Sequence, residues 1–223
     1  MGGFDEENKA REDYLLKCLD SVRSFLSKYL SEVRDAREAA DNVWQVLREM
    51  EPLRPLTVAY YLFDDCRDEV QPRIASQLRY LQDQGHQVFI LFRGDAPLWV
   101  RDAVSPQDLI QVAPESGIEA VLPDVDVLVG TSWKTAWDVM LCRRAEPILL
   151  ETEADTFKLF SDPTAFGYVM ELPVPVACVS EPVRNALTLY GRSPALAVTD
   201  EEVERVISLA ARMHRSAQAT TVQ

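Results

Sequence analysis

The sequence predicts a single α/β domain, a Rossmann-like parallel sheet with helices on both faces, preceded by a long N-terminal helix with coiled-coil periodicity. Three observations lead to this prediction. An apolar heptad pattern runs through the first 51 residues. After it, short apolar runs with β-branched or aromatic residues recur, as in strands buried on both faces. Helical stretches separate these runs, and repeated strand–helix–strand units require right-handed crossovers and hence a parallel sheet.

The predicted N-terminal helix occupies residues 1–51. From Asp5 onward this segment contains no Gly or Pro, and Pro52 and Pro55 then end it. Apolar residues recur in alternating steps of four and three, which favours a coiled coil and a homo-oligomer formed through residues 15–50. The seam consists of Leu15, Leu19, Val22, Leu26, Tyr29, Val33, Ala36, Ala40, Val43, Leu47 and Met50. Other apolar residues widen the stripe, so a helical hairpin or a helix packed on its own domain is the alternative.

Residues 52–215 form the predicted domain. Its strands are expected over residues 56–63, 87–93, 126–130, 147–151 and 175–180, with weaker candidates at 109–112 and 195–198. Its helices are expected over residues 72–84, 132–145 and 181–190. A last helix begins with an acid-rich first turn after Thr199 and runs to about His214. Residues 216–223 are predicted to be a disordered tail.

Composition and charge exclude several classes of protein. Asp and Glu number 36 against 23 Lys and Arg, and the formal net charge of -13 repels nucleic acids and anionic membrane surfaces. No apolar run approaches the length of a membrane span, which predicts a cytoplasmic protein without an integral membrane segment. The cysteines lie in separate segments without a C-x-x-C pair, which predicts free thiols and no zinc site.

Ligands of an open parallel sheet bind beyond the carboxyl ends of its strands, so the loops that follow the predicted strands are the candidate sites. The first such loop holds Asp64, Asp65 and Arg67 but no glycine. Dinucleotide-binding and P-loop motifs need glycines at set spacings, and none occurs in this chain, so we expect no nucleotide cofactor. The acidic residues would suit a divalent cation, but no second ligand cluster is evident, and a solvated loop without metal is the preferred interpretation.

The turn after the third main strand is the best candidate for binding an anion or a sugar. It contains Thr131, Ser132, Trp133 and Lys134, where hydroxyl groups and N–H groups meet a positive charge at the start of a helix. Simple N-capping by Thr131 or Ser132 explains the same residues, and both roles are compatible.

Two later turns add further candidates for substrate binding. Glu151, Glu153 and Asp155 follow a strand at the same edge of the sheet, where they would accept hydrogen bonds from sugar hydroxyls or act as a general base. Ser180 and Arg184 occupy the next strand-to-helix turn, where Ser180 also suits a helix cap.

No catalytic set is evident from the sequence. The two histidines, His86 and His214, lie far apart, and neither a Ser-His-Asp nor a Cys-His arrangement can be assembled from the spacing. The catalytic residues are therefore left unassigned.

Four segments carry a resemblance to a known family. They are PRIASQLRYLQDQGHQVFIL, DVDVLVGTSWKTAWDV, PILLETEADTFKLF and PVACVSEPVRNALTLYG. In their order and spacing they resemble the N-terminal, acceptor-side domain of the retaining GT-B-fold glycosyltransferases of group 1. The resemblance covers residues 56–192, and the chain as a whole is about half as long as such an enzyme.

The resemblance implies a half domain. Members of the family carry glycines in the first loop, where this chain has Asp64 and Asp65, and they continue into a second domain that binds the nucleotide sugar. The resemblance therefore implies an acceptor-side domain that is inactive alone and works with a donor-binding glycosyltransferase subunit in glycan or polysaccharide synthesis. A non-catalytic, coiled-coil-dimerised scaffold with a degenerate glycosyltransferase fold is the alternative.

Overall fold

The computed structural model describes residues 52–62, 71–151, 171–172, 174–192 and 194–221. The predicted N-terminal helix lies outside the described residues, and its heptad seam stays a prediction. Five candidate site residues also lie outside the described residues, namely Asp64, Asp65, Arg67, Glu153 and Asp155.

Within the described residues, seven strands form one sheet in the order β3-β2-β1-β4-β5-β6-β7. All neighbouring strands are parallel, which confirms the predicted parallel sheet. The strands are β1 Thr57–Leu62, β2 Gln87–Phe92, β3 Leu109–Gln111, β4 Val127–Gly130, β5 Glu146–Glu151, β6 Val176–Cys178 and β7 Ala195–Leu196. The two weakest strand candidates of the sequence form β3 and β7, the two end strands of this order.

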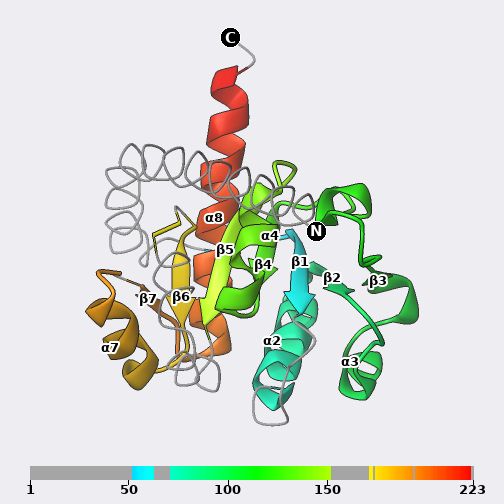
Figure 1. The fold of residues 1–223 in the computed structure, drawn as a ribbon, viewed down its shortest axis with the longest axis horizontal. Helices are drawn as coiled ribbons and strands as arrows, with labels where there is room; N and C mark the ends of the chain where they lie inside the picture. The colour runs from blue at the N-terminus through cyan, green and yellow to red at the C-terminus, as the bar shows by residue number, and fades with distance from the viewer. Residues whose placement is uncertain (1–51, 63–70, 152–170, 173, 193, 222–223) are drawn as a thin grey trace, which may run out of the picture.

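Helices cover both faces of the sheet, as the sequence predicts. They are α2 Gln71–Asp83, α3 Leu98–Ala103, α4 Ala136–Leu141, α7 Glu181–Leu189 and α8 Asp200–Thr221, with one-turn 3-10 helices η1 Pro106–Asp108, η2 Ile118–Ala120 and η3 Trp133–Thr135. Apolar residues of α2, α3 and α8 share one buried cluster with Tyr60 of β1, and those of α4 and α7 share another with Tyr61. Because successive residues of a strand point to opposite faces, these clusters lie on the two sides of the sheet. Figure 1 shows α4 on the near side and α8 on the far side.

The helix predicted over residues 132–145 is shorter in the structure. It consists of η3 followed by α4, and the backbone becomes extended at Cys142, with φ -73° and ψ 122°. Arg143 donates its backbone N–H to the Glu119 carboxylate, and the Arg144 guanidinium donates to the Glu119 carbonyl at 3.2 Å. Contacts with the segment around η2 therefore end this helix early, which local sequence preference does not reveal.

The last helix is longer than the sequence predicts. Helix α8 continues through residues 216–221, which the sequence analysis assigns to the tail, and it ends at Thr221. These residues contain neither Gly nor Pro, and nothing in them interrupts a helix that is already anchored on the sheet.

Candidate functional site

The strand order places a topological switch point between β1 and β4. From β1 the chain proceeds outward to β2 and β3, and from β4 it proceeds outward in the other direction to β5, β6 and β7. Crossovers on the two sides of such a point diverge, and ligands of open α/β sheets bind there, beyond the carboxyl ends of the strands. The turn after β4, which the sequence singles out, lies at this point.

The hydroxyl groups of the turn after β4 are used within the protein. The backbone N–H and the Oγ1 of Thr131 both donate to the carbonyl of Tyr61, at 3.2 and 3.1 Å. Ser132 Oγ accepts from the backbone N–H of Lys134 at 3.2 Å and so caps η3. Both side chains are buried, with 2% exposure each. The capping interpretation therefore holds for Ser132, whereas Thr131 ties the turn to β1.

Close packing at this turn requires the glycine at its start. A Cβ atom added to Gly130 would lie 2.4 Å from Thr135 Oγ1. That hydroxyl cannot easily move, because it is fully buried and donates to the Ser132 carbonyl at 2.6 Å. Gly130 therefore lets the strand, the 3-10 turn and α4 approach one another.

Trp133 and Lys134 are the more accessible predicted residues of this turn. Both side chains are partly exposed, and Trp133 packs against the apolar cluster under α4 and α7. Lys134 thus supplies a positive charge at the switch point with partial access to solvent. Its role in binding stays a prediction.

A polar cluster of Tyr61, Arg93 and Asp138, called here the Tyr61 cluster, lies beside this turn and was not predicted from the sequence. Arg93 follows β2 directly and donates from Nε to the Tyr61 hydroxyl at 2.7 Å. Tyr61 in turn donates to Asp138 Oδ2 of α4 at 3.2 Å. Burial raises the pKa of Tyr61 above its ordinary value, while the hydrogen bond from Arg93 acts in the opposite direction.

Arg93 also holds the loop that follows β3. Its guanidinium donates to the carbonyls of Ala113, Pro114 and Ser116 at 2.9, 2.8 and 3.1 Å. Bonds to four acceptors occupy most of the donor capacity of one guanidinium. Arg93 therefore positions the rim of the candidate site. The sequence does not indicate this role, because Arg93 ends an apolar run and is expected there only as the last residue of a strand.

The predicted residues after β5 and β6 lie farther along the same edge. Glu151 is the last residue of β5 and pairs in register with Cys178 at the end of β6. Ser180 caps α7 by accepting from the backbone N–H of Val183 at 3.4 Å. Arg184 forms an ion pair with Glu181 of the same helix at 2.6 Å. Ser180 and Arg184 thus have local partners, and a role in substrate binding is untested for both.

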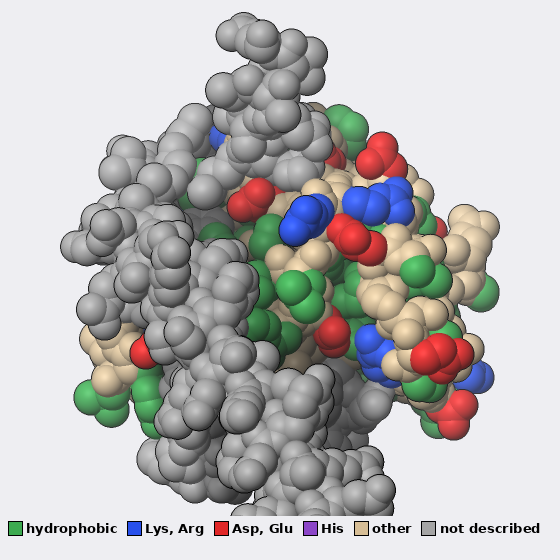
Figure 2. Space-filling model, turned by 45° about the horizontal axis from the view of Figure 1, so that its top comes forward, with side chains coloured by type: hydrophobic (Ala, Val, Ile, Leu, Met, Phe, Trp, Pro, Cys, Tyr) green, Lys and Arg blue, Asp and Glu red, His purple; other side chains and the backbone are tan. Residues whose placement is uncertain are grey.

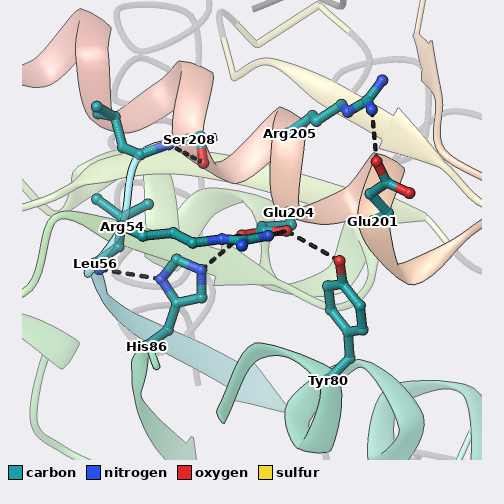
Figure 3. Close-up of polar contacts among 9 residues, drawn as sticks. Arg54, Leu56, Tyr80, His86, Glu201, Glu204, Arg205 and Ser208 are labelled. Carbon is teal, nitrogen blue, oxygen red and sulfur yellow. Dashed lines mark hydrogen bonds and ion pairs between the residues drawn. The ribbon is translucent and has the colours of Figure 1, made fainter. Parts of the chain in front are cut away.

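A buried histidine–carboxylate cluster lies at the opposite edge of the sheet, where β1 and β2 begin (Figure 3). Glu204 of α8 accepts two hydrogen bonds from Arg54, with Nε to Oε1 at 2.5 Å and Nη2 to Oε2 at 2.8 Å. The Tyr80 hydroxyl donates to Oε2 at 3.1 Å, and His86 Nε2 lies 3.0 Å from Oε1. These four residues are called the Glu204 cluster.

The Glu204 cluster is structural, although a buried His–Glu pair is a common feature of active sites. His86 Nδ1 accepts from the backbone N–H of Leu56 at 3.0 Å, so its proton resides on Nε2, which donates to Glu204. Both ring nitrogens are thereby used, and the His86 and Glu204 side chains have no exposed surface. No nitrogen is left to accept a proton from a substrate.

The hydrogen bonds of the Glu204 cluster also set the charge of the carboxylate. Burial alone would raise the pKa of Glu204, but the hydrogen bonds from Arg54, His86 and Tyr80 outweigh burial and lower it below its ordinary value. The nearby Ser208 hydroxyl accepts from the backbone N–H of Leu53 at 3.1 Å. Helix α8 is therefore fastened to the segment that leads into β1.

Charge and ligand chemistry limit what the described surface binds. Figure 2 shows Lys and Arg side chains interspersed with Asp and Glu on the face turned to the viewer, without a broad basic area among the described residues. No group of three or more His, Cys, Asp or Glu residues in the described part of the chain is arranged to hold a metal ion. Among the described helices, none is long and apolar enough to cross a membrane.

Comparisons with known proteins give little further information. No family model matches the sequence, and no curated protein matches it. One similar solved structure is the crystal structure of a glycosyltransferase from Rickettsia africae ESF-5, with 15% sequence identity and a TM-score of 0.36. The match covers 63% of this chain and 41% of that chain. A likeness this weak carries no argument about function.

Proposed function

We propose that this domain is a glycosyltransferase-like acceptor-side half domain. It binds a sugar acceptor beyond the carboxyl ends of β1 and β4, and it works with a separate donor-binding chain in glycan or polysaccharide synthesis. Lys134 at the switch point and the rim held by Arg93 are the described groups that contact the acceptor. Self-association through residues 15–50 would assemble the complex.

The internal hydrogen bonds of the turn after β4 are the main support for this proposal. The turn after β4 lies at the switch point, but its first two hydroxyls and the N–H groups of Thr131, Lys134 and Thr135 are used internally. Its 3-10 helix is a single turn, so the turn offers no open row of N–H groups for a diphosphate. One or two contacts at this turn are enough to bind a sugar hydroxyl. The diphosphate of a nucleotide sugar, by contrast, needs a phosphate-binding site that another part of the complex supplies.

Transition-state electrostatics support the need for a partner. Transfer from a nucleotide sugar develops negative charge on the leaving diphosphate, which has to be stabilised by cations or helix N-termini. In the described part of this edge, Arg93 is engaged by carbonyls and by Tyr61, and Lys134 adds only a single positive charge at the switch point. The donor-binding chain would therefore supply the groups that neutralise the diphosphate.

A glycan array probed with the full chain tests acceptor binding. We expect binding to at least one glycan, and we expect Lys134→Ala to weaken it several-fold. Arg101→Ala, which removes an exposed cation on α3, is the matched control and leaves binding unchanged. Failure to bind any glycan, or equal weakening by both variants, would contradict the proposal.

A second candidate is a non-catalytic interaction protein. Large apolar side chains are exposed on α4 and α7, which cover the same face of the sheet, including Leu141 at 65% and Leu189 at 86% exposure. Exposed apolar residues on one face favour a protein partner. A pull-down with the natural chain and with the Leu141→Ser and Leu189→Ser variants distinguishes the two functions. A protein partner that binds the natural chain but neither variant, together with no glycan binding by the natural chain, favours the scaffold.

A further inference from the structure

A second polar cluster lies on the other face of β1, between the first two turns of α2 and the start of α8. It consists of Tyr60, Arg73, Gln77 and Asp200 and is called the Tyr60 cluster. The Tyr60 hydroxyl donates to Gln77 Oε1 at 3.4 Å, and Arg73 Nη1 lies 3.9 Å from Asp200 Oδ1. Ser76 Oγ donates to Asp200 Oδ2 at 2.7 Å, which joins the two helices.

Three atoms of the Tyr60 cluster are buried without a hydrogen-bond partner. They are Nε2 of Gln77, Nε of Arg73 and Oδ1 of Asp200. Gln77 is only 1% exposed, so bulk water does not solvate its amide. Folded proteins rarely leave such groups unpaired, so these atoms call for a partner outside the chain, which is either ordered water or a ligand.

The charges around these atoms limit the chemistry of that partner. Asp200, Glu201 and Glu202 are all in the first turn of α8, so an anion such as phosphate is repelled despite the two helix N-termini. A metal cation is disfavoured by the guanidinium of Arg73. A neutral ligand therefore suits the cluster best.

The unpaired atoms match the hydrogen-bonding pattern of hydroxyl groups. Gln77 Nε2 and Arg73 Nε are donors, and Asp200 Oδ1 is an acceptor, whereas a hydroxyl oxygen accepts and its hydrogen donates. Burial, reinforced by the Asp200 charge and opposed by Arg73, raises the pKa of Tyr60, so its phenol stays protonated and acts only as a neutral group.

We propose that the Tyr60 cluster binds the hydroxyl groups of a neutral polyol of the sugar class. Gln77 and Arg73 donate to the ligand, and Asp200 accepts from it. The outer wall of the cluster is formed by the Arg73 and Asp200 side chains, which are 32% and 20% exposed. Because the three unpaired atoms have almost no exposed surface and Arg73 also donates to the carbonyls of Ala197 and Val198, these two side chains have to move aside to admit the ligand. The inference goes beyond the proposed function, because this site is on the other face of the sheet and requires no donor chain.

Nuclear magnetic resonance titration of the full, ¹⁵N-labelled chain tests this site. The probes are glycerol, D-glucose and N-acetylglucosamine, with inorganic phosphate as the ionic comparison. We expect at least one polyol to shift the side-chain amide signal of Gln77 saturably, while phosphate leaves it in place. The side-chain amide signal of Gln77 is assigned as the one that is missing from the spectrum of the Gln77→Met variant.

Two variants and one control make the test specific. We expect Gln77→Met and Asp200→Asn to weaken polyol binding at least tenfold, as followed by the backbone amide signals of α2. Gln82→Met changes a partly exposed glutamine of the same helix and retains full binding. Backbone spectra and thermal unfolding establish that each variant is folded.

Three results would overturn the inference. They are the absence of a saturable shift with every polyol, a shift with phosphate alone, and ordered water that keeps all three atoms paired in a crystal soaked in sugar. The proposed function is tested by a different signal, since glycan binding that depends on Lys134 can fail while the Gln77 shift persists. The two failures are therefore distinguishable.

Discussion

The Glu204 cluster and the Tyr60 cluster are both polar groups under α8, yet they differ in how completely they are paired. In the Glu204 cluster both carboxylate oxygens and both nitrogens of His86 have partners. In the Tyr60 cluster, two donors and one acceptor are buried without a hydrogen bond. A fully paired cluster stabilises the fold, whereas unpaired buried atoms lower stability unless a further partner binds them. The Glu204 cluster is thus a structural element, whereas the Tyr60 cluster is the place where we propose ligand recognition.

Removal of the carboxylate from the Glu204 cluster is expected to have the largest effect. Glu204→Ala leaves the buried donor of His86 and the partly exposed hydroxyl of Tyr80 without their acceptor, and it should lower the free energy of unfolding by about 3 kcal/mol. Urea denaturation at neutral pH measures the change. Glu201→Gln, which breaks an exposed pair with Arg205 on the same helix, is the control and should cost less than about 0.5 kcal/mol. Equal effects would show that the Glu204 cluster has no special role.

Overpacking the turn after β4 should have the next largest effect. Gly130→Ala forces a methyl group against Thr135 Oγ1, and we expect a loss of about 2 kcal/mol in the free energy of unfolding. Gly117→Ala is the matched control, because nothing lies within 4 Å of its added Cβ atom and its φ is -70°. If Thr135→Ala in the same chain does not recover part of the loss, the steric explanation is wrong.

Acid should weaken the Glu204 cluster in a defined direction. The pKa of Glu204 in the folded protein is lower than the ordinary carboxyl pKa of about 4.3. The carboxylate therefore makes its full contribution to the free energy of unfolding above that ordinary value, and this contribution is lost as the pH falls through the pKa of the folded protein. The stability difference between the natural chain and Glu204→Gln should therefore shrink only below that pH. A difference that shrinks between pH 8 and pH 6 instead would contradict the assigned protonation state.

The smallest effect is expected in the Tyr60 cluster, with the opposite sign. Gln77→Met removes an unpaired buried amide at the cost of one long hydrogen bond to Tyr60. We expect the unliganded protein to gain stability by up to about 1 kcal/mol, as measured by urea denaturation. A clear loss of stability would place the Tyr60 cluster with the Glu204 cluster as a structural element.

Local pattern was sufficient to predict the parallel sheet and the positions of α2, α4, α7 and α8, but it did not predict α3. The short apolar runs and their spacing predict seven strand positions, and Ser180 followed by Glu181 and Pro182 predicts the start of α7. Both signals arise from neighbours in the chain. The short α4 and the long α8 were mispredicted because contacts with Glu119 end one helix and no local signal ends the other.

The polar clusters could not be predicted in this way. His86 and Glu204 are 118 positions apart, and Ser76 and Asp200 are 124 apart, so only the folded chain brings them together. Gln77 is an ordinary polar residue of a helix in the sequence, and its burial follows from the docking of α8 on α2. Arg93 likewise gains its role from the loop after β3.

Isothermal titration of the isolated chain with uridine diphosphate and guanosine diphosphate tests the central claim most directly. Because the described residues at the switch point offer no group of donors that fits a diphosphate, no saturable heat is expected from either nucleotide. Saturable 1:1 binding that disappears in Lys134→Ala would place a complete donor site within this chain, and the half-domain account would then be wrong.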